Sequence, residues 1–140
     1  MFNKNYEDRL AAWRDFRDEL EEAEDPFRKV IDFYKAAPYV SMHTDAWTQE
    51  MWPNPWELLN ENQYDEFCTV LGMCYSLQLT DRFKGSKFEI HICTNRENSE
   101  LHYLLYVDDT VLNWNNNYVH KSEMPQQIVP QKIYCMDHVH

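Results

Sequence analysis

The stretch Asn62-Gln63-Tyr64-Asp65-Glu66-Phe67-Cys68 opens a helical pattern that extends to about residue 79. Apolar residues recur along one face of this helix, and they are Phe67, Val70, Leu71, Cys74 and Leu77. Such spacing predicts an amphipathic helix whose apolar face is buried. We expect this helix to be the central buried element of the fold.

The period of the pattern changes after this helix. Residues 88–93, Phe-Glu-Ile-His-Ile-Cys, alternate between two faces and predict a strand. Pro130 lies in the last predicted strand and indicates an edge position, because proline offers no N–H to a neighbouring strand. The other strands are predicted over 101–107, 111–115 and 128–136, with Asp108-Asp109 as the tight turn between the first two of these.

Two helices are predicted ahead of the central one. Residues 7–24 are amphipathic, with Trp13, Phe16 and Leu20 on the apolar face, and a second helix starts at Pro26 and ends before Pro38. An irregular, aromatic-rich connector over 38–56 follows. Helices first and antiparallel strands afterwards predict an α+β fold, a small antiparallel sheet packed on a central helix. We expect one compact domain overall, with a helical segment over 1–37 and the α+β core over 38–140.

Composition excludes several functions. A net charge of −11 argues against nucleic acid or an anionic membrane as a partner, because both attract basic surfaces. The two glycines exclude a glycine-rich phosphate loop. The charged N-terminus lacks the apolar core of a signal peptide, so we expect no secretion by that route. The four cysteines form no CxxC pair, which favours free thiols over disulfides or a zinc site.

The residues around Tyr64 resemble the transglutaminase-like (papain-related) signature Gly-x-Cys-x-[Asp/Glu]-Phe-Ala. Asp65, Glu66 and Phe67 fall on the family's positions, and Tyr64 falls where the family has its nucleophilic Cys at the start of a buried helix. The resemblance extends over roughly 53–115: residues 56–59 match the segment upstream of the Cys helix. Downstream, residues 102–109 match the strand that opens with the catalytic His, and Asn113 matches the third polar residue. The resemblance to the transglutaminase-like family implies a degenerate domain with no catalytic residue, no cofactor and no metal.

Hairpin geometry places two of these residues together. With the turn at Asp108-Asp109, residue 104 faces 113 and residue 102 faces 115. Since side chains alternate along a strand, His102 and Asn113 are predicted on one face, about 7 Å apart as diagonal neighbours. In a Cys-His-Asn site the Asn orients the imidazole that activates the thiol.

The nucleophile is the missing part of this arrangement. A helix N-terminus activates a thiol, whereas a tyrosine phenol has a pKa near 10 and cannot replace it in acyl transfer. Cys68 is one helical turn further on and is the alternative nucleophile, about 6 Å deeper beside Phe67. We therefore expect Tyr64 to fill the former cleft near His102, with a hydrogen bond between the Tyr64 hydroxyl and the His102–Asn113 pair.

The aromatic content indicates either a well-packed core or a substantial interface, and the aromatic-rich connector favours an interface with other proteins of a larger assembly. The apolar face of the first helix is expected to dock on this domain or on a partner, with the partner favoured. The candidate interface residues are Trp13, Phe16, Leu20, Trp47, Trp52 and Trp56. The Trp52–Trp56 segment, followed by residues 77–80, resembles small proteins of large tailed bacteriophages. That resemblance implies a virion component of the neck, tail or baseplate, located in the virion or in the cytoplasm of the infected bacterium.

Two alternatives stay open at this point. One is an active cysteine hydrolase or acyltransferase that uses Cys68, His102 and Asn113. The other is an acidic inhibitor or adaptor that binds a host protein, with the carboxylates of residues 15–25 joined to others in one large patch. Binding to such a patch would be lost at high salt.

Overall fold

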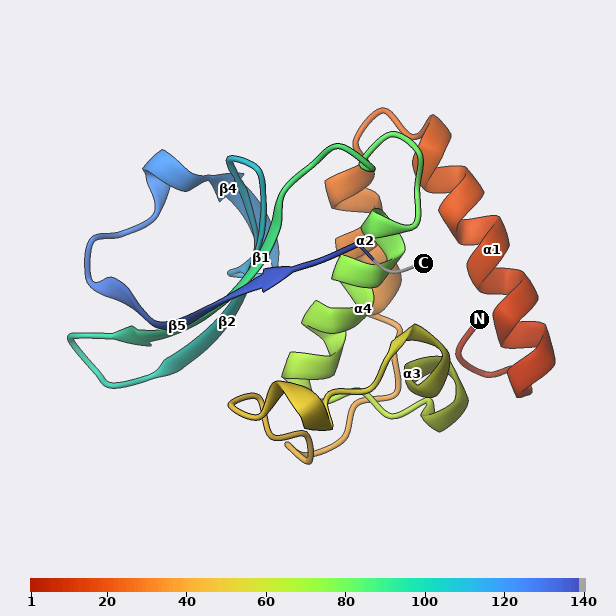
Figure 1. Ribbon diagram of the computed structural model, residues 1–140, viewed down its shortest axis with the longest axis horizontal. Coiled ribbons are helices and arrows are strands. Elements are labelled where there is room, and N and C mark those ends of the chain that lie inside the picture. Colours follow the sequence, from red (N-terminus) through yellow and green to blue (C-terminus); the bar gives the residue numbers. More distant parts are fainter. Residues whose placement is uncertain (139–140) are drawn as a thin grey trace.

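Helices and strands form two layers in the computed structural model, which describes residues 1–138 (Figure 1). Four α-helices lie on one side of a five-stranded antiparallel sheet, as the sequence predicts for the α+β class. The helices are α1 (Tyr6–Glu22), α2 (Pro26–Tyr34), α3 (Pro55–Glu61) and α4 (Glu66–Gln78), with short 3₁₀ turns η1 (Gln49–Met51) and η2 (Lys121–Glu123). Within the described residues, no helix combines the length and apolar character that crossing a membrane requires.

Local capping fixes where the first three helices begin. The Asn5 side chain accepts a hydrogen bond from the backbone N–H of Asp8 at the start of α1, and Asp25 does the same for α2, whose first residue is Pro26. Asn54 and Glu57 form a reciprocal capping box at α3. These caps satisfy backbone N–H groups that have no partner inside a helix.

Helix α4 begins at Glu66 rather than near residue 62, which corrects the predicted start. Asn62 adopts a left-handed conformation (φ 53°) that ends α3, and Asp65 then caps α4 by accepting from the N–H of Cys68. Tyr64 therefore precedes the helix instead of opening it. Almost every residue from Phe67 to Gln78 is buried, which confirms α4 as the central element.

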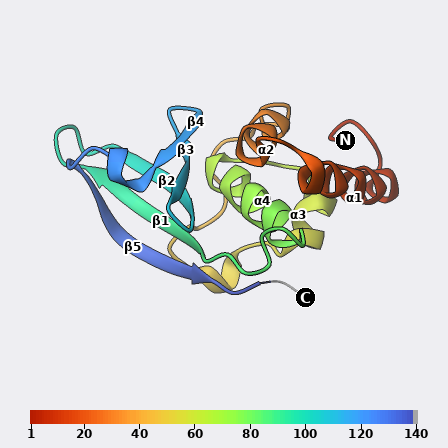
Figure 2. The ribbon, with the colours of Figure 1, turned by 90° about the horizontal axis from the view of Figure 1, so that it is seen from above.

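The sheet has the strand order β4-β3-β2-β1-β5 (Figure 2). Pro130 lies in an edge strand, as predicted, opposite Cys93 where the register shifts. The short strand β4 was not predicted from the sequence. The strands are β1 (Phe88–Asn95), β2 (Leu101–Val107), β3 (Thr110–Trp114), β4 (Asn117–His120) and β5 (Ile128–Met136).

The two faces of the sheet bury different side chains. Phe88, Ile90 and Leu105 join the main core between the sheet and the helices. On the opposite face, Cys93 and Leu104 belong to a second, smaller apolar cluster that also includes Val111, Tyr106 and Trp114. Consecutive residues of β1 and β2 thus serve different cores, because side chains alternate across a strand.

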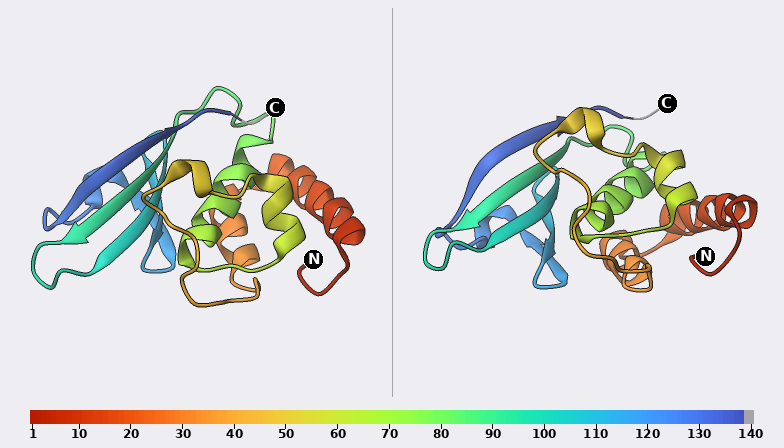
Figure 3. Two further views of the ribbon diagram at one scale, coloured as in Figure 1. Left: turned by 60° about the horizontal axis from the view of Figure 1, so that its bottom comes forward. Right: turned by 90° about the horizontal axis from the view of Figure 1, so that it is seen from below.

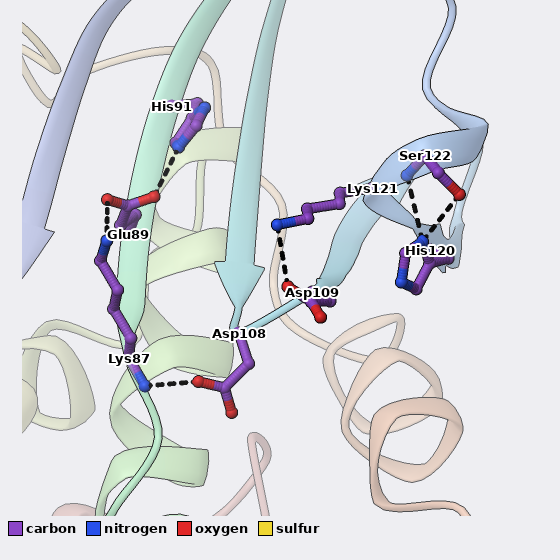
Figure 4. A network of polar contacts seen from close by, with 8 residues as sticks. All are labelled: Lys87, Glu89, His91, Asp108, Asp109, His120, Lys121 and Ser122. Carbon is purple, nitrogen blue, oxygen red and sulfur yellow. Dashed lines mark hydrogen bonds and ion pairs between the residues drawn. The ribbon is translucent and has the colours of Figure 1, made fainter.

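A polar network ties the loop before β1 to the β2–β3 turn (Figure 4). The backbone N–H of Lys87 donates to Asp108 Oδ1 at 2.9 Å, and Lys87 Nζ lies 3.3 Å from Glu89. Glu89 also contacts His91 Nε2 at 3.1 Å, while Lys121 pairs with Asp109. Burial lowers the pKa of His91, against the raising effect of Glu89. These contacts fix the predicted turn in place.

The apolar face of α1 packs on this chain and not on a partner. Trp13, Phe16 and Leu20 are buried in the main core, and Trp13 Nε1 donates to Ser76 Oγ of α4 at 2.9 Å. This corrects their assignment as interface residues. Their apolar spacing predicts burial, but sequence periodicity alone does not say which surface covers them. Residues 1–37 consequently share one core with the rest of the described chain.

Candidate functional site

Tyr64 sits immediately before the cap of α4 and is almost completely buried. Its backbone pairs with the connector, since its N–H donates to Pro38 O and its carbonyl accepts from Val40. Its ring packs against Phe2 and Tyr34, with ring centroids 5.4 and 5.9 Å away. Burial raises the pKa of the phenol well above its ordinary value. Tyr64 thus fills the helical layer of the core.

His102 points to the other side of the sheet. It pairs with Cys93 across β1 and β2, and its ring centroid lies 5.3 Å from that of Trp114 in the second cluster. The neighbouring Tyr103 faces α4, where it contacts Phe67. The expected hydrogen bond between Tyr64 and His102 is not formed, because neither the Tyr64 hydroxyl nor His102 Nε2 has a hydrogen-bond partner. This corrects the prediction that the Tyr64 ring lies beside His102.

Asn113 is turned away from His102 by a bulge. The predicted register holds as far as Leu105 opposite Leu112. At Asn113 the backbone adopts a left-handed conformation (φ 70°), and its side chain donates to Tyr103 O at 2.8 Å and to Glu66 Oε1 at 3.4 Å. A single extra residue in a strand redirects the side chain in this way. His102 and Asn113 therefore do not form the predicted pair.

Cys68 is fully buried in the first turn of α4. Its Sγ lies 3.2 Å from Thr44 Oγ1. Burial is the main cause that raises the pKa of the Cys68 thiol to about 12, although the Thr44 hydrogen bond acts against it. The helix N-terminus alone would lower this pKa. The structure does not bring Cys68, His102 and Asn113 together as a catalytic triad.

The structure instead brings Cys68 together with two residues of the connector. Asp65, which is completely buried, accepts from the backbone N–H groups of His43 and Thr44 at 3.0 Å each and from that of Cys68 at 2.7 Å. Its Oδ2 lies 3.3 Å from His43 Nδ1. Burial alone would raise the pKa of Asp65, but the three backbone hydrogen bonds, together with a side-chain hydrogen bond from Cys68, outweigh it and hold the pKa below its ordinary value.

His43, Asp65 and Cys68 form what we call the His-Asp-Cys cluster. One nitrogen, one oxygen and one sulfur of these side chains lie within 4.8 Å of one another. Sequence reasoning missed the cluster because His43 stands 22 residues before Asp65, in a connector without periodicity. The sequence feature that could have pointed to the cluster is Asp65 itself, because it is a helix N-cap residue directly ahead of an apolar helix.

The backbone of the connector between α2 and α3 passes around α4 (Figure 3). Several of its apolar side chains are exposed to solvent. Trp47 and Trp56 are exposed as the interface prediction requires, whereas Trp52 is half-buried against Phe67 and Tyr134. The prediction for Trp52 is therefore corrected. We define the connector surface as the exposed residues Tyr39, Met42, Trp47, Met51 and Trp56.

An acidic cleft of about 420 Å³ opens beside the connector surface. Met51 and Trp52 supply apolar lining, and His43 connects the cleft with the His-Asp-Cys cluster. Among the described residues no Lys or Arg lines it, and its carboxylates are Asp45, Glu50, Glu57 and Glu61. A cleft with this lining attracts positive charge.

Comparison of the chain with protein-family models, with curated proteins and with solved structures finds no match in any of the three.

Proposed function

We propose that this protein is a non-enzymatic interaction protein of a larger assembly, which binds a partner protein through the connector surface and the acidic cleft. The main support for this proposal is the distribution of exposed apolar side chains. Of the seven large apolar residues exposed in the described chain, five lie between Tyr39 and Trp56. Concentrated apolar exposure of this kind marks interaction sites on otherwise polar surfaces.

The lining of the cleft supports a partner of positive charge. Aromatic residues and Met at an interface supply apolar contact area, while carboxylates at its rim select a partner of opposite charge. A basic segment with apolar side chains, in which Arg or Lys alternates with Leu or Trp, fits both features. As the setting we propose a virion part of a tailed bacteriophage, on the resemblance of the Trp52–Trp56 segment.

The acidic run of α1 is less suited to this role, because part of it has partners within the chain. Glu21 accepts hydrogen bonds from the backbone N–H groups of Asp81 and Arg82, and Asp25 caps α2. An acidic adaptor that used residues 15–25 as one patch would have to compete with these contacts. The connector surface supplies the apolar area and the adjoining acidic cleft supplies the charge.

A synthetic peptide with alternating Arg and Leu residues tests the proposal, with binding followed by tryptophan fluorescence. We expect Trp47→Ala and Met51→Ala each to weaken binding at least tenfold, whereas Ile133→Ala, at another exposed apolar residue on β5, leaves it unchanged.

Charge is tested with a matched pair of double variants. Glu50→Gln with Glu61→Gln should weaken binding and its salt dependence more than Glu19→Gln with Glu22→Gln, which removes the same charge from α1. Equal effects of the two double variants, or full binding by Trp47→Ala, would show that the peptide senses only the net charge and would reject the proposed surface.

A further inference from the structure

We propose that His43, Asp65 and Cys68 form a mononuclear binding site for a divalent transition metal of the zinc class. The site is distinct from the connector surface and serves no catalytic step. The three side chains offer an imidazole nitrogen, a carboxylate oxygen and a sulfur, which are the ligand types of protein zinc sites.

The spacing of the ligand atoms fits one ion. One ligand atom from each of His43, Asp65 and Cys68 lies within 4.8 Å of the other two. Two ligands bound at about 2.0–2.1 Å at the tetrahedral angle are separated by roughly 3.3 Å. A small movement of the three side chains therefore brings these atoms to the spacing of ligands around one ion.

Backbone N–H groups already hold the carboxylate in position. An ionised carboxylate has about four acceptor positions, and three of those on Asp65 are occupied by the N–H groups of His43, Thr44 and Cys68. Oδ2 accepts from His43 and Thr44 and Oδ1 accepts from Cys68, so the position left for a metal is on Oδ1. Hydrogen bonds of this kind orient metal ligands, and the Thr44 hydroxyl is placed to stabilise a thiolate at Cys68.

Charge also favours an ion at this position. Asp65 is completely buried, and within residues 1–138 its only ion-pair neighbour is His43, with no Lys or Arg. Buried carboxylates are normally paired with a cation or bound to a metal. On binding, the Cys68 S–H bond breaks, the sulfur donates its electron pair to M²⁺, and the proton leaves to solvent. The thiolate and the carboxylate then balance the two positive charges without any change in oxidation state.

The site is reached from the acidic cleft. His43 is 37% exposed in its side chain, and both His43 and Thr44 line the cleft. A solvent molecule from the cleft supplies the fourth ligand. Sulfur and imidazole ligands select Zn²⁺ or Co²⁺ over Mg²⁺ and Ca²⁺, which prefer all-oxygen sites.

Titration of the reduced full-length protein with Co²⁺ tests the site, because a thiolate bound to Co²⁺ gives a charge-transfer band in the near ultraviolet. We expect the band to saturate at one equivalent, to disappear on addition of Zn²⁺, and to be absent with Cys68→Ser. His43→Ala should weaken the apparent affinity at least tenfold. Cys135→Ser and His120→Ala, which alter an exposed cysteine and an exposed histidine outside the cluster, should behave like the wild type.

Thermal unfolding gives a second measurement that does not depend on the fold of the Cys68 variant. His43→Ala changes an exposed side chain and keeps the backbone N–H that Asp65 binds, so it should fold normally. Zn²⁺ should raise the Tm of the wild type and not that of His43→Ala. The absence of a band in the wild type, a band that persists in Cys68→Ser, or an equal Tm increase in both proteins would each overturn the proposal.

Discussion

Asp65 joins two segments of the chain through one carboxylate, and its charge should be visible in the pH dependence of stability. Its pKa in the folded state is held below the ordinary value by the backbone N–H groups it binds. A lowered folded-state pKa contributes stability that is present above the unfolded pKa of about 3.9 and is lost as pH falls through the folded value.

Asp65→Asn should therefore flatten the decline of the unfolding free energy between pH 5 and pH 2 relative to the wild type. Urea unfolding followed by tryptophan fluorescence across this range measures the decline. Asp15→Asn, an exposed acid on α1, serves as the control and should keep the wild-type slope. A decline that is the same in Asp65→Asn and the wild type would mean that the carboxylate is not charged in the native state.

The four cysteines should differ sharply in reactivity. Cys135 is exposed, whereas Cys68, Cys74 and Cys93 are buried. Burial raises the pKa of the Cys93 thiol to about 11 and that of Cys68 to about 12, so almost no thiolate is present at neutral pH. We expect a thiol reagent at pH 7.5 to label Cys135 alone, and mass spectrometry of digested protein identifies the labelled residue.

Cys135→Ser should then remain unlabelled until the protein is unfolded in guanidinium. Selective labelling of Cys68 in this variant, lost on His102→Ala, would instead support the cysteine hydrolase or acyltransferase alternative.

At the scale of elements, α2 and α4 are in close contact at Gly72. A Cβ atom at this position would lie 2.5 Å from Tyr34 Cε1 and 2.7 Å from its Cζ. The Tyr34 ring cannot move freely, because its hydroxyl is hydrogen-bonded to Ser76 at 2.9 Å. Although alanine is a better helix former than glycine by about 1 kcal/mol, overpacking costs about 1–3 kcal/mol.

Gly72→Ala should thus lower the free energy of unfolding by roughly 1–2 kcal/mol. Gly85→Ala is the matched control, since no atom lies within 4 Å of the added methyl group there. Chemical denaturation measures the free energy of unfolding of both variants. A Gly72→Ala protein as stable as the wild type would show that α2 can shift away from α4.

The side chain of Phe67 anchors α4 to the sheet. It is completely buried and contacts Trp52 of the connector and Tyr103 of β2, at ring centroid separations of 4.9 and 5.5 Å. Phe67→Ala should cost about 3–5 kcal/mol in unfolding free energy, as large-to-small core changes do. Tyr39→Ala, at a highly exposed site, should change it by less than about 0.5 kcal/mol. A loss below about 1 kcal/mol for Phe67→Ala would place α4 outside the core.

Most elements could be predicted from the sequence because apolar periodicity reports burial. The strands over 101–107 and 128–136 have the predicted bounds, and the turn at Asp108-Asp109 sets the predicted register. Strand β4 was missed because it is four residues long and follows a turn of asparagines with positive φ. The Asn113 bulge is accompanied by a contact with Glu66, 47 residues away, which no local pattern contains.

At the scale of the whole molecule, the predicted grouping of Tyr64, His102 and Asn113 was wrong because it depends on contacts between segments that are distant in the sequence. The transglutaminase-like resemblance remains a prediction. Tyr64 lies in the main core, whereas His102 packs on the opposite face of the sheet with the second cluster. This outcome depends on which side chains of β2 face α4. The His-Asp-Cys cluster needs the connector folded against α4. Such contacts between segments come from packing of the complete chain, whereas periodicity describes each segment alone.

Arginine side chains join both ends of α1 to other parts of this chain. Near the N-terminal end, Arg9 Nε donates to Leu59 O at 2.8 Å. At the C-terminal end, Arg82 donates to the carbonyls of Leu20 and Ala23 at 2.8 Å each. Charged donors on terminal carbonyls satisfy acceptors that a helix end leaves free.

The hydrogen bonds from backbone N–H groups to the Asp65 carboxylate, which we call the backbone clamp, have a consequence for amide hydrogen exchange. In an irregular segment most N–H groups exchange with solvent quickly, but those of His43 and Thr44 bind a buried carboxylate, and that of Val40 binds Tyr64 O. We expect these three amides to exchange more slowly, by at least a factor of about 100, than that of Asp45, which NMR in deuterium oxide would measure. Rates as fast as that of Asp45 would contradict the clamp. Slow exchange at rates shared with Cys68 would mean that this part of the connector and the first turn of α4 open together, as one cooperative unit.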